Sequence, residues 1–268
     1  ADNQKFTLNG DGNIRELGFN PLGLTSLLWS SVNNDSASNA DGGWNKYING
    51  LSDTKGYMSI VYVKRAGNST NGRFYHGCDK SYTDDLSGSQ NTNPYFNNPS
   101  LSILPKDVWC VSVGIIRAKD GQKTSAPGSF VYRLDTGSKL SGNGIKNAEY
   151  KMRSGGNRQT HRNYLYYSTD PKARLDWWNP GLYEINGNEP TLADLLGADP
   201  DRKGDGKIIT LVQGGRLNDL PDLEVTTNLF EWPSTGNQNY ATQFLGYFHP
   251  SKTGYHTFGI ASDNQGEL

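Results

Sequence analysis

Short stretches that read as β-strands recur along this chain, and they constrain its fold more than any other feature. The clearest is GYMSIVYVKRAG, which begins at Gly56, and the most apolar is VWCVSVGIIRA, which begins at Val108. Further strands are expected in GRFYHGCD, SFVYRLDTG, HRNYLYYSTD and RLDWWNPGLYEING. Short strands at this spacing, bounded by glycine, proline, asparagine or aspartate, are typical of a β-sandwich. The chain is therefore expected to be all-β.

The composition fits an ordered, loop-rich protein. Only 34% of the residues are hydrophobic, but six Trp and nine Phe are available to build a core. Residues 33–43 (NNDSASNADGG) and 80–107 are expected to be long loops. One segment differs, because NEPTLADLLG has Thr191 as an N-cap, Asp194 three residues later and Gly197 as a C-cap, which predicts one or two turns of helix.

Charge and hydropathy exclude two classes of partner. The formal net charge is -1, so no basic excess steers the chain to nucleic acid. The longest apolar runs, such as VSVGII, are too short for membrane insertion. The chain begins ADNQKF, without the charged and apolar regions of a signal peptide.

Catalytic motifs are not found in the sequence. It contains no P-loop, no GxGxxG, no HExxH and no GxSxG. Neither Glu-x-Asp-x-x-Glu nor Glu-x-x-x-Glu, which would place the carboxylates of a glycosidase on one strand face, occurs. We therefore expect a protein that is not an enzyme, although carboxylates that meet across strands remain open.

Aromatic and planar polar residues on strands supply the candidate ligand-binding residues. In HRNYLYYSTD, Arg162, Tyr164 and Tyr166 alternate with Leu165, and an unpaired Arg162 is costly to bury. These three side chains are therefore expected on an accessible sheet face, with Leu165 in the core. An aromatic ring stacks on the flat face of a sugar, and neighbouring polar groups bind its hydroxyls. The other candidates for ligand binding are Tyr75, His76 and Trp178.

For each aromatic residue the alternative is ordinary packing. Tyr75 and His76 point to opposite faces of one strand, and of the adjacent Trp177 and Trp178 one is expected inside and the other outside. Cys78 and Cys110 are expected to be buried and near one another, and the sequence leaves open whether they are bonded or only packed.

Two polar loops carry oxygen ligands at alternate positions, as a calcium loop does. One contains Asn9, Asp11 and Asn13, and the other contains Asp199, Asp201 and Asp205. Neither has the full twelve-residue EF-hand pattern, so solvated turns are the alternative for both.

Residues 15–197 resemble a concanavalin-A-like jelly-roll module. The resemblance runs from DGGWN through NTNPYF and LPKDVWCVSVGII, and its most specific part pairs HRNYLYYSTD with NGNEPTLADLL. Modules of this family recur in phage tail fibres and other appendages, and in large secreted bacterial proteins. The resemblance implies a jelly-roll β-sandwich domain over residues 1–200 and carbohydrate binding, without defining the site.

Residues 210–268 resemble the first half of a protective-antigen-type lectin domain. The motif is carried by Gly246, Tyr247, Phe248, Pro250, Gly254, Tyr255, Phe258, Ile260, Ser262 and Asp263, followed by Asn264 where the family has a second Asp. In sugar-binding members the two acidic residues hold a calcium ion. The resemblance therefore implies a partial second β-sandwich over residues 206–268 and a metal site at Asp263 and Asn264, weakened by the loss of one charge.

Together these features favour a lectin-like recognition or adhesion module that binds a surface glycan. Its expected place is extracellular or on a virion surface, in a phage tail appendage or a bacterial adhesin. The alternatives are a structural spacer of a fibre or virion and a polysaccharide-degrading enzyme. Because the last predicted strand, residues 255–261, precedes only SDNQGEL, a downstream segment or a neighbouring chain is expected to complete the second sandwich.

Overall fold

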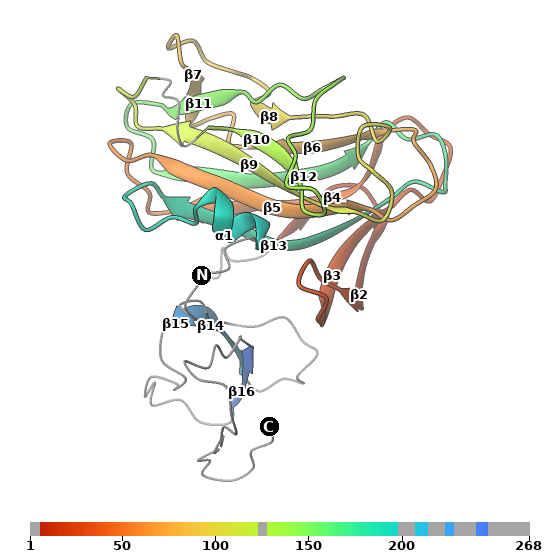
Figure 1. The fold of residues 1–268 in the computed structure, drawn as a ribbon. Helices are drawn as coiled ribbons and strands as arrows, with labels where there is room; N and C mark the ends of the chain where they lie inside the picture. The colour runs from red at the N-terminus through yellow and green to blue at the C-terminus, as the bar shows by residue number, and fades with distance from the viewer. Residues whose placement is uncertain (1–5, 123–127, 198–206, 214–222, 228–239, 246–268) are drawn as a thin grey trace. The chain divides into compact units, whose positions relative to one another are not determined.

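The computed structural model describes residues 6–122, 128–197, 207–213, 223–227 and 240–245 (Figure 1). The chain divides into two compact units, Ala1–Asp199 and Pro200–Leu268. Nearly all regular structure in the described residues is β-strand, as the sequence predicts. None of the described helices is long and apolar enough to cross a membrane.

The first unit contains a five-stranded antiparallel sheet. The strand predicted in HRNYLYYSTD is the central strand of this sheet. Each of its residues from Arg162 to Tyr166 pairs with a residue on both neighbouring strands. In spatial order the strands are β1 (Thr7–Leu8), β4 (Ala40–Asn49), β12 (Arg158–Tyr166), β6 (Arg73–Gly77) and β8 (Tyr95–Asn97).

An eight-stranded sheet forms the other layer of this unit. Its strand pairs are antiparallel, except that β11 runs parallel to β9. In spatial order the strands are β2 (Asn13–Phe19), β3 (Thr25–Val32), β13 (Arg174–Glu184), β5 (Tyr57–Arg65), β9 (Trp109–Arg117), β11 (Glu149–Met152) and β7 (Thr83–Asp85), with β10 (Phe130–Arg133) paired to β9.

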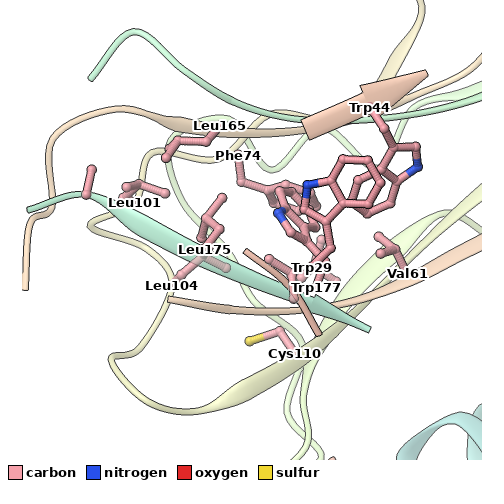
Figure 2. Close-up of a cluster of buried hydrophobic side chains, with 13 residues drawn as sticks. Trp29, Trp44, Val61, Phe74, Leu101, Leu104, Cys110, Leu165, Leu175 and Trp177 are labelled. Carbon is pink, nitrogen blue, oxygen red and sulfur yellow. The ribbon is translucent and has the colours of Figure 1, made fainter. Parts of the chain in front are cut away.

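The core lies between the two sheets, so the first unit is a β-sandwich. Trp44, Phe74 and Leu165 come from the five-stranded sheet and pack in one cluster with Trp29 and Trp177 of the other sheet (Figure 2). The rings of Trp29 and Trp44 have centroids 4.7 Å apart, and those of Trp44 and Trp177 have centroids 5.4 Å apart. Burial of such large side chains is the main favourable contribution to folding of this unit.

A second apolar layer covers the other face of the eight-stranded sheet, where the helix α1 (Leu192–Leu196) lies. Leu195 packs there with Met58 and Ile60 of β5. The predicted capping box is present, because Thr191 accepts from the Asp194 N–H and Asp194 accepts from the Thr191 N–H. The helix ends at Gly197 in the left-handed region, as predicted.

The strand predictions are confirmed for β5, β6, β9, β10, β12 and β13. Two loop predictions are wrong in part. The segment 33–43 already belongs to β4 from Ala40 onward, and the long loop 80–107 contains the short strands β7 and β8. Both errors have one cause: glycine-rich or very short strands lack alternation and are fixed by their neighbours in the sheet.

The second unit contains a three-stranded antiparallel sheet. Its order is β15 (Leu223–Thr227), β14 (Lys207–Gln213) and β16 (Tyr240–Leu245). The predicted strand 255–261 and the proposed metal ligands Asp263 and Asn264 lie outside the described residues, as do Asp199, Asp201 and Asp205.

Candidate functional site

The candidate site is the outer face of the five-stranded sheet. Leu165 of β12 is buried in the core cluster, so the alternating side chains of Arg162, Tyr164 and Tyr166 leave the sheet on the opposite face. This register was predicted from the sequence. Tyr164 lies opposite Gly43 on β4 and opposite Tyr75 on β6.

Five tyrosines and two arginines gather here, and we call this group the tyrosine face. Each ring is in edge contact with at least one other. The members are Tyr75, Tyr95, Tyr164, Tyr166, Tyr167, Arg73 and Arg162. Tyr75 is central, because its ring lies 4.7 Å from that of Tyr95 and 6.2 Å from those of Tyr166 and Tyr167, centroid to centroid.

Burial divides these rings into two roles. Tyr95 and Tyr164 are buried, Tyr75 and Tyr166 are partly exposed, and Tyr167 is 50% exposed. The buried rings support the others, and the exposed rings are presented to solvent. The expectation that Tyr164 is accessible is therefore wrong, because Tyr95 and Arg162 pack against its ring. Tyr167 has a backbone φ of 64°, a left-handed conformation that breaks the strand alternation and lets it lie beside Tyr166, with ring centroids 4.4 Å apart.

Arg162 is held rigidly among the buried rings. Its Nε donates to the Tyr164 hydroxyl at 3.1 Å, one Nη donates to the Tyr95 hydroxyl at 2.8 Å, and the other Nη donates to the Cys78 carbonyl at 3.3 Å. The guanidinium also lies over the rings of Tyr95 and Tyr164, at 4.7 and 5.4 Å from their centroids. The Tyr164 hydroxyl in turn donates to the side-chain oxygen of Asn45.

The second arginine lies at the other end of the face. Arg73 is opposite Tyr166 in the sheet, and its guanidinium donates to the Asn98 carbonyl at 3.0 Å and to the Asn143 side-chain oxygen at 3.5 Å. Burial raises the pKa values of Tyr75 and Tyr95, so both phenols keep their protons at neutral pH and can donate hydrogen bonds.

A further arginine stacks beside the tyrosine face. Arg158 of β12 lies over the rings of Tyr47 and Tyr82, 4.4 and 4.7 Å from their centroids. Its charge is balanced by Asp79, whose Oδ2 accepts from the Arg158 Nε and from the Thr160 hydroxyl, both at 2.8 Å. This Asp79 is thus fully engaged in structure.

His76 was predicted to bind ligand, and its position corrects that expectation. The side chain is completely buried between the sheets, where Nε2 bonds the Ser59 hydroxyl at 2.9 Å and Nδ1 bonds the Ser112 hydroxyl at 3.0 Å. Burial, and after it the neighbouring His161, lowers the pKa of His76 well below its usual value. A neutral histidine that bridges β5 and β9 has a structural role and does not reach the tyrosine face.

Trp178 also does not join the site. It is half-buried on β13 of the other sheet, where it packs with Tyr62, the two ring centroids 5.2 Å apart. Its neighbour Trp177 is buried in the core, so the prediction that one of the pair points inward is confirmed. The strand belongs to the opposite layer, which puts Trp178 and the tyrosine face on different sheets.

The two cysteines are both buried and both free, so they are packed side chains and do not form a disulfide. Cys78 belongs to a cluster with Phe96 and Tyr150, whereas Cys110 belongs to the main core cluster. The expectation that they lie together has no support, because they pack in different clusters. Burial raises both thiol pKa values to about 12, so neither is a reactive thiolate at neutral pH.

Sequence reasoning missed Arg73, Tyr95 and Tyr167. Arg73 stands two residues before Tyr75, so strand alternation places the two side chains on the same face and could have identified Arg73. Tyr95 lies in a three-residue strand and Tyr167 in a left-handed turn, and neither has a periodicity that assigns it to a face.

The first of the two polar loops, which contains Asn9, Asp11 and Asn13, is used for structure. Asn13 donates to the Gly10 carbonyl at 2.9 Å, and its side-chain oxygen accepts from Trp29 and from the Gly43 N–H, both at 2.8 Å. Among the residues that the structure describes, no group of three or more His, Cys, Asp or Glu side chains is placed to hold a metal ion.

Two cavities lie away from the tyrosine face. One, of about 240 Å³, is bordered by Lys55, Tyr57 and Glu184. The other, of about 370 Å³, lies beside α1 and is bordered by Phe130, Tyr132, Lys139 and Glu189. Neither cavity is bordered by a member of the tyrosine face.

Comparison with known proteins finds distant structural likeness only. No family model matches the chain, and no curated protein matches it. Among solved structures, the binding domain of botulinum neurotoxin serotype G aligns with a TM-score of 0.38 and 12% identity over 78% of this chain and 53% of that chain. An arabinose-bound α-L-arabinofuranosidase aligns with a TM-score of 0.29 and 10% identity over 68% of this chain and 25% of that chain.

A third solved structure is similar to the same degree. It concerns botulinum neurotoxin type C, whose cell entry depends on two ganglioside molecules, and it aligns with a TM-score of 0.35 and 11% identity over 91% of this chain and 66% of that chain. The chain thus spans about half the length of the first of these proteins and a quarter of the second.

Proposed function

We propose that this protein binds a surface glycan through the tyrosine face and does so without catalysis. The observation that carries the proposal is the row of partly exposed rings, Tyr75, Tyr166 and Tyr167, flanked by the guanidinium groups of Arg73 and Arg162. Aromatic rings stack on pyranose faces, and rigid donors beside them bind ring hydroxyls. Because three such rings lie side by side, the face favours a saccharide of several sugar rings over a single small molecule.

Within the described part of the chain, no member of the tyrosine face is bonded to a carboxylate, which supports a binding role. None of its seven members is acidic, and the nearby Asp79 is engaged by Arg158 and Thr160. Glycoside hydrolysis in most families needs two carboxyl groups beside the scissile bond. The expected release of reducing sugar from any bound polysaccharide is therefore nil.

The place of action follows from the same proposal. Recognition of a surface glycan belongs outside the cell or on a virion, in a phage tail appendage or an adhesin related to concanavalin-A-like modules. Calcium at Asp263 and Asn264 remains part of the proposal, and glycan binding measured with and without a chelator tests it.

The binding site is tested on a glycan array with the full chain and two variants. Tyr75→Ala combined with Tyr166→Ala is expected to weaken glycan binding at least about tenfold, because two stacking platforms are lost. The matched control is Tyr132→Ala, which removes a partly buried ring beside the 370 Å³ cavity on the other sheet. Loss of binding in the control but not in the double variant would place the site at that cavity, and binding of no glycan by the parent chain would overturn the proposed function.

A further inference from the structure

The two arginines of the tyrosine face have no acidic partner. Among the described residues, Arg73 and Arg162 form no ion pair. Arg15 and Arg65 also form none, but Arg15 lies over the Trp29 ring and Arg65 bonds backbone carbonyls away from this face. A carboxylate pairs with each of Arg117, Arg133, Arg153, Arg158 and Arg174.

Both unpaired cations are partly withdrawn from water. The Arg73 and Arg162 side chains belong to half-buried residues, and their bonded partners are the neutral oxygens of tyrosine, asparagine and backbone groups. Partial removal of a cation from water costs free energy unless an opposite charge approaches the cation. The face therefore carries two positive charges that the described part of the protein does not neutralise.

Free donors remain on both groups. A guanidinium has five N–H bonds, and the hydrogen bonds of Arg162 use three donors, one on each nitrogen. Those of Arg73 use one N–H on each Nη, which leaves its Nε–H and one N–H on each Nη. Guanidinium groups bind carboxylate and sulfate oxygens more strongly than they bind neutral hydroxyls, because the hydrogen bonds are charge-assisted.

We infer that the glycan bound by the tyrosine face is anionic, with carboxylate or sulfate groups that pair with Arg73 and Arg162 while its rings lie on Tyr75, Tyr166 and Tyr167. This inference rests on the proposed function and specifies the class of saccharide. Arg162, fixed by two tyrosine hydroxyls, sets the position of one anionic group, and Arg73, more loosely held, accepts the next along the strands.

The test compares each acidic saccharide with its own uncharged form. The full chain is titrated with uronic-acid oligosaccharides and the same oligosaccharides after carboxyl reduction, and with a sulfated oligosaccharide and its desulfated form. At least one acidic form is expected to bind about tenfold or more tightly than its neutral counterpart, the factor for one charge-assisted pair. The preference is expected to shrink as salt is raised, because salt screens a partly exposed ion pair.

The arginine variants assign the effect to this face. Arg73→Gln is expected to reduce the acidic preference severalfold without loss of folding, and Arg162→Gln is expected to reduce it further. Arg133→Gln is the matched control, since it removes the same charge from a partly exposed arginine on β10 of the other sheet. Equal loss in the control would mean that net charge, and not the tyrosine face, produces the preference, and it would overturn the inference.

Failure of this inference is distinguishable from failure of the proposed function. Equal affinity for acidic and neutral saccharides, with loss of both in the Tyr75→Ala, Tyr166→Ala double variant, would overturn the anionic specificity and keep glycan binding. Binding of neither form of any saccharide would overturn both.

Discussion

At the scale of single residues, one buried acid among those that the structure describes, Asp41, has no cationic partner. Asp41 on β4 is 2% exposed, and its Oδ2 accepts from the Ser168 N–H at 3.0 Å while its Oδ1 has no hydrogen-bond partner. Burial raises the pKa of Asp41 to about 6, against the opposing hydrogen bond from Ser168, and Asp35 adds to the rise. At neutral pH the protein thus keeps an ionised carboxylate where a neutral group is preferred.

Replacement of this acid is expected to stabilise the protein. Because the folded-state pKa lies above the unfolded value, the penalty is absent at low pH and grows as the pH rises from about 4 through 6. Asp41→Asn should therefore increase the free energy of unfolding by up to about 3 kcal/mol at pH 7, with the gain fading toward pH 4. Urea unfolding across this pH range measures it.

The control for that prediction is an acid shifted in the opposite direction. The hydrogen bond from Arg133 lowers the pKa of the exposed Asp135, so Asp135→Asn is expected to give no stabilisation at pH 7. A gain for Asp41→Asn that is the same at pH 4 and pH 7 would contradict the electrostatic explanation.

At the scale of elements, the tyrosine face depends on close contact between β4 and β12. Gly43 lies opposite Tyr164 with a φ of 119°, and a Cβ at this position would meet the Asn163 carbonyl oxygen at 2.0 Å. The pairing of the two strands shifts register between Leu165 and Tyr166, where β4 accommodates Asp41 as an extra residue. Glycine is thus required for the strand that positions Tyr164.

Gly43→Ala is expected to destabilise the protein by at least about 3 kcal/mol, because backbone strain adds to a collision with backbone atoms. Gly50→Ala is the matched control, directly after the last residue of the same strand. It has a φ of 78° with nothing within 4 Å of the added Cβ, so only the left-handed conformation is penalised, by about 1–2 kcal/mol. Equal destabilisation of the two variants would show that strand contact at Gly43 is unimportant.

At the scale of the whole molecule, the first unit has hydrophobic clusters of its own. The main cluster joins both sheets, a second lies under α1, and a third surrounds Phe96 and Tyr150. A unit with its own core is able to fold by itself.

Residues 1–199 alone are therefore expected to unfold cooperatively, with a urea midpoint close to that of the same unit in the full chain. Near-ultraviolet circular dichroism is the appropriate measure, because it reports the buried tryptophans, among them Trp44 and Trp177. A fragment with no such signal, or with a gradual transition, would contradict the independence of this unit.

Local pattern was enough to predict the all-β class, six of the strands, the capped helix at Leu192–Leu196 and the outward direction of Tyr164 and Tyr166. These features follow from alternation and capping, which act within a few residues of the chain. The second resemblance, with its metal ligands, stays a prediction because those residues lie outside the described part.

Only the tertiary structure decided which strands are neighbours, and with them the membership of the tyrosine face. Tyr95 and Tyr164 are far apart in sequence. Their ring centroids nevertheless lie 6.3 Å apart, because only β6 lies between their two strands in the sheet. The sequence placed Tyr75 and His76 on opposite faces. Ser59 and Ser112 on the other sheet decided that the face with His76 is the buried one, because they supply the hydrogen bonds that a buried histidine needs. Alternation is a local property of the backbone, whereas sheet order and the pairing of buried polar groups come from contacts between distant segments, which no local pattern encodes.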